Sequence, residues 1–240
     1  MKKIILFIFI TISLFANNLS KEERKEAKQG AKYFKKILKQ VKLSNDKKTL
    51  KRITTVGKKL AKVVDKDYDW EFVLVKNSSL NAFCLPGGKV VFFTGIFDVI
   101  ENDDQIAAVM SHEIAHVLLR HGGMRGKANS ILNIPQQVGK DLLGDLIPKK
   151  YHGILDTVHE AGKQITIMRP YGRHQETEAD KIGVRIMIKA NYDPKEAIQL
   201  WKNIKKVSGK ARVPKFLSTH PDHNTRIKTI EKEINKKLVR

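Results

Sequence analysis

Two histidines four residues apart, with a glutamate between them, are the residues of this chain whose types and spacing could carry chemistry. They are His112, Glu113 and His116, which read HExxH and lie in an apolar run from residue 105 to residue 119. Residues four apart share one face of a helix, so the two imidazoles can bind the same metal ion. The pattern is typical of zinc proteases, in which the glutamate is the general base. The alternative is a surface helix with two solvated histidines.

A catalytic zinc ion needs a third protein ligand and one open position. One class of HExxH proteins takes a further histidine from the pattern HExxHxxGxxH, but Leu119 stands where that pattern needs glycine. His121 comes one residue too early, and on a continued helix it would point about 140° away from His116. We therefore predict that His121 is a polar residue near the helix end before Gly122, and that it is a poor ligand.

A second class of HExxH proteins takes a glutamate from another helix, and the candidate is the segment 173–180. Glu176 and Asp180 are four apart and share a helix face. Glu176 can supply the third ligand, and Asp180 can hold the non-ligating nitrogen of a zinc-binding histidine. The alternative is that Glu176, Glu178 and Asp180 form a solvated acidic helix start, favoured by the helix dipole. Two imidazoles and one carboxylate suit one Zn²⁺ ion per chain.

The elements that must position these residues are mainly helices, with a few short strands. Hydrophobic periodicity predicts the HExxH helix over 103–121 and the glutamate-bearing helix over 171–189. The fold class expected is therefore α+β, helix-rich with a small β-sheet beside the HExxH helix. Other helices are predicted at 22–41, 47–64, 131–146, 151–167, 194–207 and 221–238, and strands at 70–76, 81–85 and 89–94.

The first 16 residues have the pattern of a secretory signal peptide. Two lysines precede a short apolar run from residue 4 to residue 15, and Ala16 offers a small residue at the cleavage point. The alternative is an uncleaved segment that anchors the protein to the inner membrane. No cysteine lies near the cut, so a lipoprotein anchor is not expected. We expect residues 17–240 to form a single domain, with 17–45 as an N-terminal helical extension.

The chain is strongly basic, with 46 Lys and Arg against 25 Asp and Glu and a formal net charge of +21. Much of this charge lies between residues 21 and 66. One interpretation is that these basic residues lie on the solvated faces of helices; the alternative is that they attract the protein to an anionic membrane surface or to acidic partners. Nucleic acid is not expected, because no aromatic and basic binding motif is present. The single cysteine, Cys84, is expected to be a small buried hydrophobe rather than a nucleophile.

Several segments, taken in order, resemble the HtpX-like and CAAX prenyl protease family of gluzincin zinc metallopeptidases. The resemblance covers roughly residues 45 to 237, and it is greatest to the soluble periplasmic members of the BepA and LoiP type. The matching segments are 81–90 (NAFCLPGGKV), Thr94-Gly95, 111–116 (SHEIAH), 173–180 with Gly183, 191–194 (NYDP), and 218–222 (STHPD) with Arg226.

The resemblance implies roles for individual residues. The zinc ligands of the family fall at His112, His116 and Glu176, while Glu113 matches the catalytic base and Asp180 the acid behind a ligand.

Two further positions follow from the resemblance. Asn81 and Ala82 are similar to a substrate-binding edge strand, which would pair with an extended peptide; a turn residue is the alternative for Asn81. His220 is similar to a histidine that caps the zinc and keeps some periplasmic members inactive. Its alternatives are an ordinary loop histidine before Pro221 or a role at the oxyanion.

The function implied is a periplasmic, zinc-dependent endopeptidase that hydrolyses unfolded or misassembled envelope proteins as part of protein quality control. A function from another class is a chaperone-like binding module, which would hold extended polypeptides at its edge strand with the zinc site capped. The glutamate at position 113 favours the enzyme, because a purely structural metal site needs no base.

Overall fold

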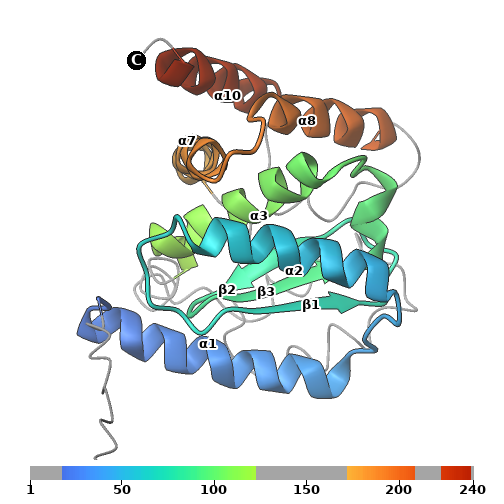
Figure 1. Ribbon diagram of the computed structural model, residues 1–240, viewed down its shortest axis with the longest axis vertical. Helices are drawn as coiled ribbons and strands as arrows, with labels where there is room; N and C mark the ends of the chain where they lie inside the picture. The colour runs from blue at the N-terminus through green and yellow to red at the C-terminus, as the bar shows by residue number, and fades with distance from the viewer. Residues whose placement is uncertain (1–17, 123–171, 209–222, 239–240) are drawn as a thin grey trace, which may run out of the picture.

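The computed structural model describes residues 18–122, 172–208 and 223–238 of the chain (Figure 1). The predicted α+β class, with a small sheet beside the HExxH helix, is confirmed. The helices predicted at 131–146 and 151–167 lie outside the described residues. In chain order the described elements are α1 (Lys21–Gln40), α2 (Lys47–Ala61), β1 (Glu71–Val75), β2 (Ala82–Leu85), β3 (Lys89–Phe93), the 3-10 helix η1 (Thr94–Asp98), α3 (Asp103–Leu118), α7 (Arg173–Lys189), α8 (Lys195–Ser208) and α10 (His223–Leu238).

The three strands form one mixed sheet in the order β1-β3-β2. β1 runs parallel to the central strand β3, and β2 runs antiparallel to it, with Ala82 opposite Phe92. The turn between β2 and β3 uses Gly87 and Gly88 at φ angles of 86° and 81°, a region that other residues rarely adopt. β2 therefore lies at one edge of the described sheet.

Both faces of the sheet are covered by helices, as Figure 1 shows. β3 is apolar along most of its length because its side chains alternate between two cores. Val91 points into a smaller core with Phe34 of α1, whereas Val90 and Phe92 point into the main core beneath α2 and α3. This packing places α3, which carries the HExxH residues, directly beside the edge strand β2.

The HExxH helix α3 is buried on every side from Gln105 to Val117. Its start is capped by Asn102, whose side-chain oxygen accepts a hydrogen bond from the Gln105 amide at 2.9 Å. The helix ends at Leu118, three residues before the predicted end at His121. Arg120 adopts a left-handed conformation with φ of 54°, and this stops the helix.

Helices α7, α8 and α10 pack over the other side of α3. α7 approaches closely because Gly183 faces the α3 backbone: a Cβ on Gly183 would lie only 3.2 Å from the His112 amide nitrogen. α10 packs against α7 and α8 through Ile230 and Ile234, which lie in the main core with Trp201. None of the helices in the described ranges is long and apolar enough to cross a membrane.

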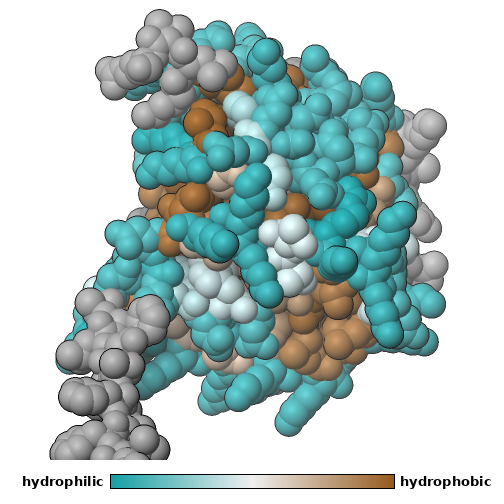
Figure 2. Space-filling model, in the orientation of Figure 1, coloured by the Kyte–Doolittle hydropathy of each residue, from teal (hydrophilic) through white to brown (hydrophobic). Residues whose placement is uncertain are grey.

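The outward face of α1 carries a row of exposed lysines. Hydrophilic residues also cover most of the face shown in Figure 2. Two of the three acidic residues of α1 pair with cations outside the row, Glu23 with Lys66 at 2.6 Å and Glu26 with Arg120 at 2.7 Å. The lysines recur at helical spacing and are Lys28, Lys32, Lys35 and Lys39.

We expect this row to draw the protein to anionic lipid vesicles, and the binding to weaken as salt screens the charges. Co-sedimentation with vesicles of anionic or of zwitterionic lipid measures it. Changing the four lysines of the row to glutamine should reduce binding to the anionic vesicles. A control with equal net charge changes four exposed lysines elsewhere to glutamine. Equal losses in both variants would show that only net charge matters. The control lysines are Lys181, Lys195, Lys202 and Lys206.

Candidate metal centre

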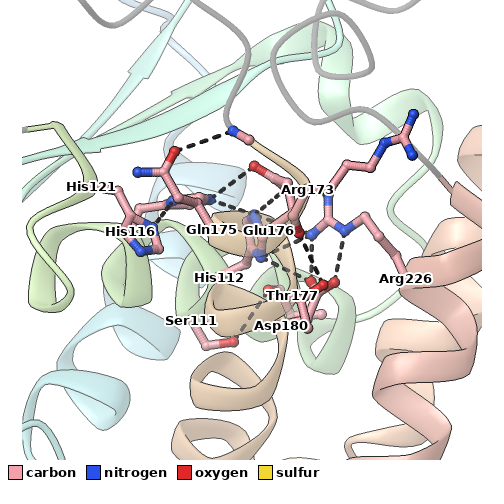
Figure 3. Close-up of polar contacts among 12 residues, drawn as sticks. Ser111, His112, His116, His121, Arg173, Gln175, Glu176, Thr177, Asp180 and Arg226 are labelled. Atoms are coloured by element: carbon pink, nitrogen blue, oxygen red, sulfur yellow. Dashed lines mark hydrogen bonds and ion pairs between the residues drawn. The ribbon is translucent and has the colours of Figure 1, made fainter. Parts of the chain in front are cut away.

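Three side chains from two helices converge on one point in the interior. The Nε2 atoms of His112 and His116, on α3, lie 3.0 Å apart. Glu176 of α7 places one carboxylate oxygen 3.4 Å from Nε2 of His112 and the other 3.4 Å from Nε2 of His116. All three residues are buried, and Figure 3 shows them turned toward one another.

The geometry of this triad fits a zinc ion. Ligand atoms held about 2.0–2.1 Å from a tetrahedral ion lie about 3.4 Å from one another, close to the three distances observed. Two imidazoles and one carboxylate are also a donor set that zinc favours. Among the residues that the structure describes, His112, His116 and Glu176 are the one group with ligand atoms placed to share a metal ion.

Asp180 lies one helical turn beyond Glu176 and contacts the back of His112. Its Oδ1 atom is 3.1 Å from Nδ1 of His112, the nitrogen on the far side of the ring from Glu176. A carboxylate in this position can keep a proton on Nδ1 and leave Nε2 free to bind a metal.

Arg226 of α10 is part of the site, although its place in a family motif was its only signal in the sequence. Its guanidinium group is buried, pairs with Glu176 at 2.9 Å, and donates from Nε to Asp180 at 2.8 Å. It also stacks over the Trp201 ring, 3.9 Å from the ring centroid. Arg226 thus balances the charge of two carboxylates that are closed off from water.

These contacts shift the protonation of His112 and Asp180. Burial and the neighbouring Arg226 both lower the pKa of His112, but hydrogen bonds with Asp180 and Glu176 outweigh them and raise it to about 9. Burial alone would raise the pKa of Asp180, but the Arg226 guanidinium and the contact with His112 hold it below its ordinary value.

We expect zinc uptake at neutral pH to release a proton from His112. Because its pKa is raised to about 9, the metal-free protein holds that proton below this pH, and zinc must displace it. Apparent affinity should therefore weaken as pH falls from 9 to 7. Calorimetric titration in buffers of different ionisation enthalpy counts the protons released. Asp180→Asn, which removes a group that raises the pKa, should release fewer protons; equal release by both proteins would contradict this assignment.

Glu113 lies on α3 between the two histidines and is also buried. Its charge is one of the causes that raise the pKa of Arg226 and that of Cys84 on β2. Burial, followed by the Glu113 charge, raises the pKa of the Cys84 thiol, so this thiol is a poor nucleophile at neutral pH.

The backbone N–H and C=O groups of the edge strand β2 point alternately toward β3 and away from it. The Asn81 carbonyl accepts a hydrogen bond from the Phe93 amide at 3.0 Å, so Asn81 faces the central strand. Because alternate residues of an antiparallel strand bond to the same neighbour, Ala82 and Cys84 direct their N–H and C=O groups away from β3. The substrate role of Asn81 and Ala82 stays a prediction, as does the zinc-capping role of His220, which lies outside the described residues.

The direction of the His121 side chain differs from the one predicted from the sequence. His121 is fully buried, and its Nδ1 atom lies 2.8 Å from Nδ1 of His116. The predicted direction, about 140° away from His116, was wrong because it assumed a continuous helix, whereas α3 ends at Leu118 and Arg120 redirects the chain. His121 is not among the residues that converge on the metal position, but it touches one of them.

The fold and the geometry of the site are those of an HExxH metallopeptidase domain. The chain belongs to Peptidase family M48, whose profile matches residues 45–234.

Relatives come from mitochondria and from bacteria. The chain is 35% identical over 169 residues to Mitochondrial metalloendopeptidase OMA1 of Schizosaccharomyces pombe, covering 69% of this chain and 47% of that protein. It is 28% identical over 174 residues to human Metalloendopeptidase OMA1, covering 71% and 33% of the two chains. It is also 28% identical over 207 residues to Beta-barrel assembly-enhancing protease of Escherichia coli K12, covering 84% and 42%. The matched region thus spans about half the length of these relatives, or less.

Proposed function

We propose that this protein is a zinc-dependent endopeptidase. The observation that carries the proposal is the convergence of His112, His116 and Glu176 on one point, with Glu113 on the same helix beside them. A purely structural metal site gains nothing from a buried carboxylate at that position, whereas hydrolysis needs a base there.

The ion would be held by His112, His116 and Glu176. Asp180 would keep His112 in place, and Arg226 would do the same for Glu176. A bound zinc ion would polarise the scissile carbonyl and lower the pKa of a water molecule. Glu113 takes the proton from the attacking water and passes it to the leaving amine nitrogen. The burial of Glu113 excludes bulk water, which would otherwise weaken its interaction with the reacting atoms.

The substrate would lie in an extended conformation along β2. Ala82 and Cys84 turn their backbone groups away from β3, so a peptide can add to the sheet there by main-chain hydrogen bonds. Because β2 packs beside α3, a peptide on this edge would pass close to the HExxH residues. Main-chain pairing depends little on side chains, which suits a protease that acts on unfolded chains.

The proposed substrates are unfolded or misassembled envelope proteins, and the proposed location is the periplasm. The signal-peptide pattern over residues 1–16 supports the location. The likeness to Beta-barrel assembly-enhancing protease of Escherichia coli supports a role in the envelope. Both are inferred from these similarities and not from the geometry of the site.

Cleavage of unfolded casein tests the reaction. We expect cleavage by the zinc-loaded protein, its loss after chelation, and its return when zinc is added back. Peptides with both ends blocked should be cut as fast as free ones if the enzyme is an endopeptidase. Zinc bound without cleavage of casein or of any blocked peptide would instead favour the chaperone-like binding module.

A further inference from the structure

The two ligand histidines are supported from behind in different ways. His112 contacts the carboxylate of Asp180 directly, at 3.1 Å. His116 has a second histidine behind it, since its Nδ1 atom lies 2.8 Å from Nδ1 of His121. The two ring planes are 66° apart. Both residues are buried, so the surrounding side chains hold the contact in place. The mechanism proposed above makes no use of His121.

The protons of this pair have one consistent arrangement when a metal is bound. A neutral imidazole that binds a metal through Nε2 carries its proton on Nδ1. His116 must therefore donate from Nδ1, and Nδ1 of His121 must accept. A neutral His121 that accepts at Nδ1 carries its own proton on Nε2.

The far side of His121 faces a carboxylate whose charge favours a proton on Nε2, at a distance longer than an ordinary hydrogen bond. Its Nε2 atom lies 3.5 Å from the carboxylate oxygen Oε2 of Glu178. The same oxygen is 3.1 Å from Nδ1 of His174, one turn earlier on α7. The helix that brings Glu176 to the metal position and Asp180 to His112 thus also brings a carboxylate to His121, so all three acids act from one element.

We propose that His121 is a positioning residue of the metal centre, and that with Glu178 it fixes the tautomer and orientation of His116. The contacts form a relay: His116 lies at the metal position, His121 contacts His116, and Glu178 lies beyond His121. His121 touches no reacting atom and acts only through His116. The proposal rests on the proposed zinc site, and its test is chosen so that the two can fail separately.

The test compares two substitutions at one position. His121→Leu fills the space without an acceptor, while His121→Asn places an oxygen close to where Nδ1 stood. Loss of a partner behind a metal ligand typically weakens binding about 10–100-fold. We expect a loss of this size in zinc affinity for His121→Leu, measured by competition with a chelator, and recovery of most of it in His121→Asn. The absorption bands of the cobalt-loaded protein should shift in His121→Leu and return in His121→Asn.

Two further variants separate positioning from simple packing. Glu178→Leu should weaken zinc binding less than His121→Leu, and Glu231→Leu, at an exposed position on α10, should have no measurable effect. Thermal unfolding of the metal-free variants shows whether any loss reflects the fold alone. Zinc binding by His121→Leu within about twofold of the unmodified protein, with an unchanged cobalt spectrum, would overturn the proposal. Failure of the unmodified protein to bind zinc would overturn the proposed function instead.

If His121→Leu does not fold, the comparison moves to Glu178. Its side chain is 40% exposed, so substitutions there are tolerated more easily. Glu178→Gln keeps an acceptor for the His121 Nε2 proton and should bind zinc better than Glu178→Leu. Equal affinities for these two variants would contradict the relay through His121.

Discussion

Glu113→Gln is expected to stop cleavage while leaving zinc bound. Glutamine has nearly the shape of glutamate but cannot take a proton from the attacking water, and general-base catalysis typically contributes about 10²–10⁴-fold to a rate. Glu113 is not among the residues that converge on the metal position, so zinc content should not change. Cleavage of casein under single-turnover conditions, with zinc measured per chain, gives both quantities.

The matched control is Glu231→Gln, the same chemical change at an exposed position on α10. It should cleave at the rate of the unmodified protein. A Glu113→Gln protein that retains zinc and cleaves as fast as this control would remove Glu113 from the mechanism. Lost zinc together with lost cleavage would show that Glu113 also supports the metal.

Arg226→Met is expected to destabilise the metal-free protein strongly. Arg226 compensates Glu176 and Asp180, and all three side chains are buried. Removing one partner of a buried ion pair typically costs about 3–5 kcal/mol, because the remaining charge stays without compensation. Arg226→Lys should recover only part of this, since an ammonium group lacks the planar fork of five donors that the guanidinium group presents to the two carboxylates. Urea denaturation of the metal-free proteins measures the free energy of unfolding.

A partly exposed ion pair supplies the control. Arg52 pairs with Asp103 at 2.7 Å, with side chains 32% and 49% exposed, so Arg52→Met should cost about 1 kcal/mol or less. Adding Asp180→Asn to Arg226→Met should recover stability, because it removes one of the uncompensated charges. Equal losses for Arg226→Met and Arg52→Met would show that the buried network contributes nothing special.

The sequence alone was enough to predict that His112 and His116 share a helix face, because this depends only on helix geometry. Any helix through this segment brings the two imidazoles to one face, whatever surrounds it. The same holds for Glu176 and Asp180 on their own helix. The short strands were also predictable, since β-rich runs flank the Pro86-Gly87-Gly88 turn.

His121 and Arg226 could not be assigned in this way. The contact of His121 with His116 depends on where α3 stops, and one left-handed residue, Arg120, changes the direction of every residue after it. Arg226 lies 46 positions from Asp180 in the chain, so their contact depends on how α10 packs against α7. Spacing along a helix is a local property of the backbone. Contacts between helices are set by side-chain packing among distant segments, such as the close approach at Gly183, which no local pattern encodes.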